Sequence, residues 1–259
     1  MAVLNGSPVT AKDALQLGLV NYGHYTSMRV AENHVRGLSQ HLDRLVHDCK
    51  VLFDADLDRD LVRKSIREAT ANRRDSFIVR VTIFDPKLEF GRPSVSAEPR
   101  VLVTIRPAPA WPLMPIRVQA VSYRRDLPAV KHVGLFGALW GRRKAQLAGF
   151  DDAVFVDGAS FISEGATWNV GFYDGDRVVW PNADVHPGVT MRLLKQVHER
   201  TMTAPVNLGD VSKMQAVFAT NTSVGVRAIS SIDQVEVPGD HPIINTLREE
   251  YEEIPPEKV

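Results

Sequence analysis

One lysine stands in a mostly apolar stretch of the chain and could act as a nucleophile. Lys131 lies in DLPAVKHVGLFGALW, residues 126–140, and is the only lysine or arginine between Arg125 and Arg142. A lysine at the start of an amphipathic helix can extend its amine to water. A desolvated lysine instead loses its proton more easily and can attack a carbonyl carbon to form a Schiff base. The residues around Lys131 leave both interpretations open.

A single carboxylate raises a related question in FISEGATWNV, residues 161–170. Glu164 follows an apolar run, and burying an unpaired carboxylate is costly. The side chain therefore either points to water at a turn or meets a cation. If the carbonyl that Lys131 attacks belonged to pyridoxal phosphate, the pyridine nitrogen would need a carboxylate partner that keeps it protonated. Glu164 is a candidate for that partner.

Two further segments carry residue types that bind phosphate groups. PGVT, residues 187–190, opens an expected helix at 188–200, and the N-terminus of a helix favours anions. ATNTS, residues 219–223, follows an expected strand and offers hydroxyl groups at a turn. Arg44 in the segment HLDRL supplies a guanidinium that could add a charge-assisted hydrogen bond.

Other common catalytic patterns are absent from the sequence. It contains no GxxxxGK or GxGxxG loop and no HExxH, and the single Cys49 cannot build a zinc site. DADLDRD at 54–60 begins like a calcium loop but has Arg59 where that loop needs glycine. GASFI at 158–162 lacks the final glycine of a nucleophile elbow. We therefore expect no metal site, and nucleotide and serine-hydrolase chemistry are disfavoured.

The composition is ordinary for a globular protein. The chain has 259 residues, is 44% hydrophobic, and contains 31 Lys and Arg against 31 Asp and Glu. This balance gives no reason to expect a nucleic-acid partner, and the basic clusters at 73–74, 124–125 and 142–144 are expected on solvated faces. No apolar run reaches the roughly 20 residues that span a bilayer, and the N-terminus lacks a signal-peptide pattern. We expect a cytoplasmic protein without a membrane partner.

The periodicity of apolar residues predicts an α+β protein. Strands are expected at 2–4, 22–30, 77–84, 100–106, 117–123, 153–156, 168–173 and 177–180. Helices are expected after Ser39 as N-cap, at 58–72, at 133–148 and at 188–200.

The domain organisation follows from one proline-rich stretch. PAPAWPLMP, residues 107–115, is predicted to be extended and stiff. We expect a small N-terminal α/β domain at 1–106, a linker at 107–116 and a larger C-terminal domain at 117–259. The acidic tail REEYEEIPPEKV is expected to fray or to cover the surface.

The order of these segments resembles the fold-type IV pyridoxal-phosphate enzymes, the class IV aminotransferase group. That group includes branched-chain and D-amino acid aminotransferases and aminodeoxychorismate lyase. LNG and YGHYTSMRV look like its first strands, HLDRL resembles its HLxRL helix, and AVKHVGLFGALW resembles the stretch with its Schiff-base lysine. ISEGATWN is similar to SEGxxxN, HPGVT to LPGIT, and ATNTS to the final phosphate turn. The resemblance covers nearly the whole chain and implies the two-domain fold of D-amino acid aminotransferase-like enzymes.

The resemblance also implies a role for each matching residue. Lys131 becomes the catalytic Schiff-base lysine, and Glu164 becomes the partner of the pyridine nitrogen. The residues expected at the cofactor phosphate are Arg44, Val189, Thr190, Thr222 and Ser223. The residues expected near the substrate are Arg80, Tyr25 and Arg29. The residues expected to be structural, because the lysine itself moves the proton, are His24 and His132.

The implied activity is a pyridoxal-phosphate-dependent transfer of an amino group from an amino acid or amine to a 2-oxo acid, in a ping-pong reaction. A homodimer is expected from the resemblance. The first alternative is a lyase of the aminodeoxychorismate lyase type, which releases pyruvate. The second is a catalytically degenerate homologue that acts as a binding protein.

Several positions depart from the family pattern. Phe136 stands where branched-chain enzymes carry tyrosine, which argues against a plain branched-chain enzyme, and YTS at 25–27 stands where many members read FET or FEG. Gly171 replaces a usual aromatic residue, and Trp180 replaces the threonine of a Thr-Pro pair. We interpret these departures as changes in substrate preference that leave the cofactor unchanged.

Overall fold

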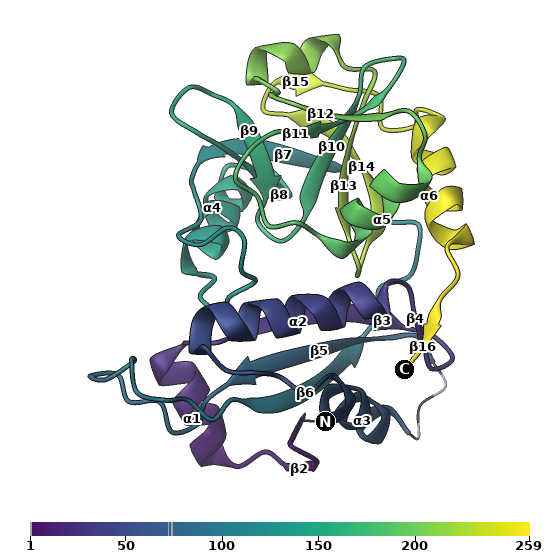
Figure 1. Ribbon diagram of the computed structural model, residues 1–259. Helices are drawn as coiled ribbons and strands as arrows, with labels where there is room; N and C mark the ends of the chain where they lie inside the picture. Colours follow the sequence, from purple (N-terminus) through teal and green to yellow (C-terminus); the bar gives the residue numbers. More distant parts are fainter. Residues whose placement is uncertain (1, 72, 74) are drawn as a thin grey trace. The chain divides into compact units, whose positions relative to one another are not determined.

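The computed structural model describes residues 2–71, 73 and 75–259 of the chain (Figure 1). Its contacts group the chain into two compact units. Unit 1 comprises Met1–Pro109, Val130–Gly134 and Pro255–Val259, and unit 2 comprises Ala110–Ala129 and Leu135–Ile254. The chain therefore first leaves unit 1 inside the proline-rich stretch.

Two short segments that the sequence pattern placed in the C-terminal part belong to unit 1 because backbone hydrogen bonds tie them there. The N–H of Tyr25 donates to the carbonyl of Lys131 at 2.9 Å, and the N–H of Val259 donates to the carbonyl of Asn33 at 3.0 Å. A division of the chain into one N-terminal and one C-terminal segment at the linker therefore does not account for these contacts.

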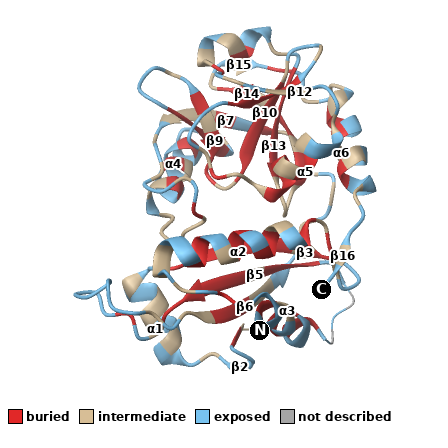
Figure 2. Cartoon of the chain, in the orientation of Figure 1, coloured by how far each residue is buried: buried red, intermediate tan, exposed pale blue. Residues whose placement is uncertain are grey.

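Unit 1 is built on a five-stranded antiparallel sheet in the order β2-β1-β6-β5-β3. Its strands are β1 (Ala2–Leu4), β2 (Ser7–Pro8), β3 (His24–Val30), β5 (Phe77–Phe84) and β6 (Arg100–Pro107). Its helices are α1 (Ala11–Val20), α2 (Leu38–Phe53) and α3 (Arg59–Thr70). One apolar side of α2 and of α3 packs on the sheet, where Met28, Leu45, Ile66 and Val79 are fully buried (Figure 2). The strand alternation thus leaves the opposite face of β3 and β5 available for polar side chains.

Helix α2 receives its N-terminal cap from the far end of the chain. Its N-cap residue is Gly37, in the left-handed region at φ 69°, and offers no side-chain bond, so the expected cap at Ser39 is wrong. The carboxylate of Glu257 instead accepts from the N–H of Ser39 at 3.1 and 3.2 Å. Glu257 lies in β16 (Glu257–Lys258), which pairs with β4 (His34–Val35).

The acidic tail is ordered, so of the two alternatives that its composition left open, fraying and covering the surface, fraying is wrong. Its first half belongs to α6 (Ile243–Glu253), whose Tyr251 is 3% exposed, and the tail ends in β16 with Val259 buried. The local composition of the tail could not reveal this order, because its strand partner lies more than 200 residues earlier in the sequence.

Unit 2 contains a mixed nine-stranded sheet in the order β12-β11-β10-β13-β14-β7-β8-β9, with β15 paired to β14. The strands are β7 (Ile116–Ser122), β8 (Asp152–Val156), β9 (Ile162–Gly165), β10 (Asn169–Tyr173), β11 (Val178–Pro181), β12 (Thr201–Ala204), β13 (Ala216–Asn221), β14 (Gly225–Ile232) and β15 (Val235–Glu236). The helices are α4 (Phe136–Leu147), α5 (Val189–Val197) and α6, with a 3₁₀ turn at Leu208–Lys213. The α+β class is confirmed.

The expected helices exist with shifted ends. The one expected at 133–148 begins at Phe136, so Lys131 precedes it in an extended segment, and the one expected at 188–200 ends at Val197. The predicted helix end at Asn72, like Arg74 of the first basic cluster, lies outside the described residues. In the part of the chain that the structure describes, no helix is long and apolar enough to cross a membrane.

The cap from the tail gives a stability prediction. Replacing Glu257 with alanine should lower the free energy of unfolding by about 1 kcal/mol, because the first turn of α2 loses its only side-chain acceptor for the Ser39 N–H in the described structure. Urea unfolding followed by circular dichroism measures this change. Glu253→Ala on the exposed side of α6 is the matched control and should be near neutral; equal effects of the two variants would contradict the capping role.

Candidate functional site

The main chain of Lys131 is fixed on both sides. Its N–H donates to Asp48 Oδ2 at 3.0 Å, and its carbonyl accepts from the N–H of Tyr25 at 2.9 Å. Asp48 lies on α2 and is 1% exposed. The amine Nζ lies 5.1 Å from the centre of the Tyr25 ring. Lys131 is therefore half-buried and held by α2 and β3, not extended from the start of a helix.

Arg80 lies on the same tyrosine. Tyr25 is 5% exposed, and the Arg80 guanidinium carbon is 3.7 Å from its ring centre. Burial lowers the pKa of Arg80 from its ordinary value. Arg80 pairs across the sheet with Ser27, so Tyr25 and Arg80 point from one face of the sheet. The structure thus brings Lys131, Tyr25 and Arg80 together within unit 1.

Arg29 is placed differently. It lies on the same face of β3, but its Nη1 donates to the carbonyl of Pro109 at 2.9 Å. This bond anchors the end of the proline-rich segment.

Arg44 belongs to a buried polar chain that the sequence pattern did not reveal. Its Nη1 donates to Thr26 Oγ1 at 3.4 Å, and Thr26 Oγ1 lies 2.7 Å from His41 Nδ1. A guanidinium can only donate, so the threonine oxygen accepts from Arg44, and the same oxygen is also hydrogen-bonded to His41. Thr26, one of the departures from the family pattern, therefore positions Arg44.

In unit 2, the cation that meets Glu164 is Arg125. Arg125 Nε lies 2.5 Å from Glu164 Oε1, and the two side chains are 10% and 4% exposed. Arg125 Nη2 also donates to the carbonyl of Ala166 at 3.0 Å, which locks the guanidinium onto the end of β9. Both side chains line a cavity of about 360 Å³. The expectation that the 124–125 cluster lies on a solvated face is right for Arg124 and wrong for Arg125, because only Arg124 pairs at the exposed surface.

A second buried pair holds the turn that follows Glu164. Arg142 donates through Nε and Nη2 to Asp152 at 2.9 and 2.8 Å, and Trp168 Nε1 donates to the same carboxylate at 2.9 Å. A Cβ at Gly165 would lie 2.0 Å from the Trp168 ring, so only glycine fits there. The Arg142 cluster was also expected on a solvated face, and for Arg142 that prediction is wrong.

The expected phosphate residues lie in two places, the N-terminus of α5, which favours anions, and the turn between β13 and β14. Helix α5 begins after Gly188, and Thr190 in its first turn is 1% exposed with an Oγ1 that has no hydrogen-bond partner among the described residues. Asn169 ties this loop down, since its Oδ1 accepts from the N–H of Gly188 at 3.0 Å and its Nδ2 donates to the carbonyl of His186 at 2.8 Å. A helix N-terminus with an unpaired hydroxyl suits a phosphate group.

The second structure is the turn that joins β13 to β14. Asn221 Oδ1 accepts from the N–H groups of Ser223 at 2.8 Å and Val224 at 2.9 Å, which orders the turn that carries Thr222 and Ser223. Strand β13 pairs with β10 so that Thr220 lies opposite Asn169. The buried Val189 belongs to the same apolar cluster as Ala216 and Phe218 of β13. The start of α5 and the turn after β13 are therefore both connected to β13.

Two departures from the family pattern have a packing reason. Phe218 lies directly opposite Gly171, and a Cβ at Gly171 would lie 2.4 Å from the Phe218 ring. Trp180 is 1% exposed and meets Phe218 edge-on, with ring centres 5.5 Å apart. The Phe218 ring fills the space that a side chain at position 171 would occupy, and Trp180 packs against that ring in the core. Our interpretation of Gly171 and Trp180 as substrate determinants is therefore not supported. Phe136, by contrast, is 80% exposed and stacks on Trp140.

The described residues provide no metal-binding arrangement. No group of three or more His, Cys, Asp or Glu side chains among them could hold a metal ion. What they provide is a lysine held by its main chain, a buried carboxylate with a cation, and a helix N-terminus with a buried hydroxyl.

The fold of the chain is found in solved structures. A branched-chain aminotransferase of Thermoproteus uzoniensis with norvaline has a TM-score of 0.86 at 16% identity, covering 97% of this chain and 93% of its own. A hypothetical aminotransferase of Mycobacterium tuberculosis in its PLP-bound form has a TM-score of 0.82 at 19% identity, covering 97% of both chains. The fold is that of the fold-type IV pyridoxal-phosphate enzymes.

The family follows from the sequence match. Residues 23–232 match the model of the family described as amino-transferase class IV. A putative branched-chain-amino-acid aminotransferase of Methanocaldococcus jannaschii is 28% identical over 255 residues, which cover 89% of this chain and 87% of the relative. The chain belongs to the class IV aminotransferase family, and the resemblance drawn from its motifs is confirmed.

The buried Arg125–Glu164 pair gives a prediction with an adjacent control. Arg125→Met should lower the free energy of unfolding by about 3–5 kcal/mol, because it leaves a buried carboxylate without its cation. Arg124→Met removes an exposed ion pair with Asp184 and should change stability by less than about 1 kcal/mol. Urea unfolding at neutral pH measures both. In Arg125→Met, adding Glu164→Gln should restore part of the loss; the pair is not a charge pair if it restores nothing.

His24 gives a pH prediction. The side chain is fully buried, neither ring nitrogen has a hydrogen-bond partner among the described residues, and burial, with a smaller effect of His47, lowers its pKa from 6.5 to about 3. The unfolded chain therefore takes up a proton below pH 6.5 that the folded chain refuses. The stability that the neutral ring contributes is complete above pH 6.5 and is lost as the pH falls toward 3, by up to about 1.4 kcal/mol per pH unit.

The measurement is urea unfolding between about pH 4 and pH 7, a range that lies mostly between the folded and unfolded pKa values of His24. His24→Leu should flatten the pH dependence, whereas His34→Gln should keep the wild-type slope. An unchanged slope in His24→Leu would show that other groups cause the acid sensitivity.

Proposed function

We propose that this class IV aminotransferase uses pyridoxal phosphate to move an amino group from an α-amino acid to a 2-oxo acid in a ping-pong reaction. The observation that carries the proposal is the main-chain clamp on Lys131, a half-buried residue whose amine lies beside the Tyr25 ring that also contacts Arg80. The family match of residues 23–232 supports the reaction class.

The described residues fit the cofactor. Thr190 offers a buried hydroxyl without a partner in the described structure, at the N-terminus of α5, as a phosphate oxygen requires. Glu164 offers a buried carboxylate beside a cation, as a protonated ring nitrogen requires. The related solved structures include an aminotransferase in its PLP-bound form and a branched-chain aminotransferase with pyridoxamine 5'-phosphate. We therefore propose that Lys131 and Glu164 hold the ring, and that the phosphate is bound by Arg44, Val189, Thr190, Thr222 and Ser223.

The protein groups would act as follows. When bound, pyridoxal phosphate supplies an aldehyde for the amino group and an electron-withdrawing ring. The Lys131 amine holds the aldehyde carbon between turnovers and, once released, carries the proton from the substrate α-carbon. Glu164 keeps the proton on the ring nitrogen because Arg125 keeps the carboxylate charged. Arg80 binds the substrate carboxylate beside Tyr25.

Further proposals concern the substrate and the oligomeric state. The curated relatives carry branched-chain names, so we propose an aliphatic α-amino acid as donor, and Phe136 in place of tyrosine distinguishes this chain from a plain branched-chain enzyme. These names support transfer over the lyase alternative. The presence of Lys131, Glu164, Arg44 and Thr190 supports catalysis over a binding role. We also propose a cytoplasmic homodimer. The buried Cys49 is a free thiol, which suits a reducing compartment.

The test is a visible absorption spectrum after incubation with pyridoxal phosphate. The wild type should show a Schiff-base band that Lys131→Ala lacks, while Lys144→Ala, a lysine on the exposed side of α4, should keep it. Activity with a 2-oxo acid acceptor should fall about 10²- to 10⁴-fold in Lys131→Ala, because the proton carrier is gone.

A panel of L- and D-amino acids then identifies the donor, because the true donor bleaches the band. Release of pyruvate without an acceptor would replace the transfer reaction by the lyase. A band that persists in Lys131→Ala would overturn the role of this lysine.

A further inference from the structure

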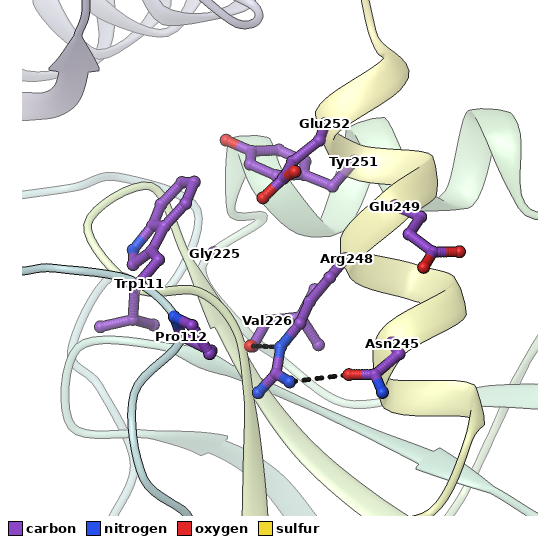
Figure 3. A pocket seen from close by; sticks show the side chains of 10 residues that line it. Trp111, Pro112, Gly225, Val226, Asn245, Arg248, Glu249, Tyr251 and Glu252 are labelled. Atoms are coloured by element: carbon purple, nitrogen blue, oxygen red, sulfur yellow. Dashed lines mark hydrogen bonds between the residues drawn. The ribbon is translucent and has the colours of Figure 1, made fainter.

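A cavity of about 240 Å³ in unit 2 contains a charge that serves the fold (Figure 3). Arg248 Nε donates to the carbonyl of Val226 at 3.0 Å, and Nη1 donates to Asn245 Oδ1 at 3.0 Å. Burial lowers the pKa of Arg248, and the charge of Glu252 opposes that shift. The bond to Val226 ties α6 to β14, so we interpret Arg248 as a structural residue.

Asp48 in unit 1 is a buried charge that contacts a residue of the proposed site. Asp48 is 1% exposed, and its two oxygens make different hydrogen bonds. Oδ2 accepts from the main-chain N–H of Lys131 at 3.0 Å, and Oδ1 lies 3.0 Å from Nδ1 of His47. The His47 side chain is more than half exposed, so it anchors the carboxylate from the solvent side while Lys131 binds the other oxygen.

The negative charge of Asp48 acts on the groups around it. Burial raises the pKa of the Cys49 thiol to about 11, and the charges of Asp56 and Asp48 add to that shift. A lysine amine lies within roughly 7 Å of its own main-chain nitrogen, so the carboxylate lies within about 10 Å of Lys131 Nζ. At that distance one unit charge moves the titration of an amine by about one pH unit. The direction favours the protonated amine, because the charges are opposite.

The titratable and charged groups near Asp48 come from α2, β3 and the segment 130–134. They are Arg44, His47, Cys49 and Lys50 on α2, His24 and Tyr25 on β3, and Lys131 and His132. Burial, with a smaller effect of His47, lowers the pKa of His24 to about 3, so this ring stays neutral in the alkaline range where an amine titrates. Variants at position 48 keep all of these groups, so a difference between them isolates the charge of Asp48.

We propose that Asp48 is a positioning residue of the transfer reaction, which holds the main chain of Lys131 and favours the proton on the lysine nitrogen. The inference rests on the proposed function, in which Lys131 forms the Schiff base. A proton on a Schiff-base nitrogen makes the neighbouring carbon more open to attack by an amino group. Burial alone would disfavour that proton, and a negative charge nearby offsets this effect. The main-chain bond also keeps the released amine within reach of the same carbon.

The first test measures the Lys131 amine in the full chain without pyridoxal phosphate. Acetic anhydride labels only the unprotonated amine, so the pH midpoint of labelling, read by mass spectrometry of the peptide that contains Lys131, reports its affinity for the proton. Asp48→Asn keeps an oxygen acceptor for the Lys131 N–H and removes the charge, so the midpoint should fall by about one pH unit. Asp43→Asn makes the same change on the exposed side of α2, where Asp43 pairs with Arg59, and should leave the midpoint unchanged.

The second test uses the protein loaded with pyridoxal phosphate. The pH midpoint of the Schiff-base band should also fall in Asp48→Asn and stay in place in Asp43→Asn. Asp48→Ala loses the acceptor as well as the charge, so kcat should fall about tenfold or more while KM changes little. Asp48→Asn should recover part of that loss in kcat, because its amide oxygen restores the main-chain bond.

The two tests separate this inference from the proposed function. If the wild type forms the band and either midpoint of Asp48→Asn stays at the wild-type value, the role of Asp48 is wrong and the proposed function stands. If the wild type forms no band, the proposed function fails, and Asp48 has no role in transfer even where the labelling midpoint shifts. If Asp48→Asn fails to fold, Asp48→Ser, which offers a small uncharged acceptor, takes its place with the same expected shifts.

Discussion

The need of a buried carboxylate for a cation organises the region around Glu164. A charge that is 3% exposed would otherwise become neutral, and a neutral acid could not hold a proton on a ring nitrogen. Arg125 meets this need, and its second bond to the Ala166 carbonyl fixes the strand end. The Arg142–Asp152 pair and the Trp168 indole then hold the next turn. The chemistry proposed for Glu164 therefore depends on charged residues of α4, β8 and the segment after β7, and on an indole donor between β9 and β10.

In unit 1, two hydrogen bonds hold the main chain of Lys131, and neither of them uses its amine. Asp48 accepts from the Lys131 N–H, and the Tyr25 N–H donates to the Lys131 carbonyl. The Nζ atom lies over the Tyr25 ring. Helix α2 contributes Asp48, His41 and Arg44 from one buried side, so the orientation of this helix sets several groups at once.

The sequence predicted what depends on short segments, and it missed what depends on distant partners. The α+β class, the main strands, the family and the motif around Lys131 could be predicted because each is written in a few adjacent residues. The ion pair of Arg125 could not be predicted, because its partner lies 39 residues away and the adjacent Arg124 has almost the same neighbours in the sequence. Asp48 and Thr26 carried no motif, and their roles follow only from the packing of α2 on β3. The aromatic exchange between Gly171 and Phe218 needed the strand register.

The pairing of β16 with β4 has a consequence for the order of events during synthesis. A ribosome makes the chain from the N-terminus, so His34 and Val35 leave it long before Glu257 and Lys258 exist. The sheet of unit 1 can form early, but β4 lacks its partner and α2 lacks its capping carboxylate until residues 255–259 are made. The segment 130–134 must likewise arrive before β3 acquires its last neighbour. Of the two units, unit 1 is therefore the one whose synthesis starts earlier and also the one whose last segment is made later.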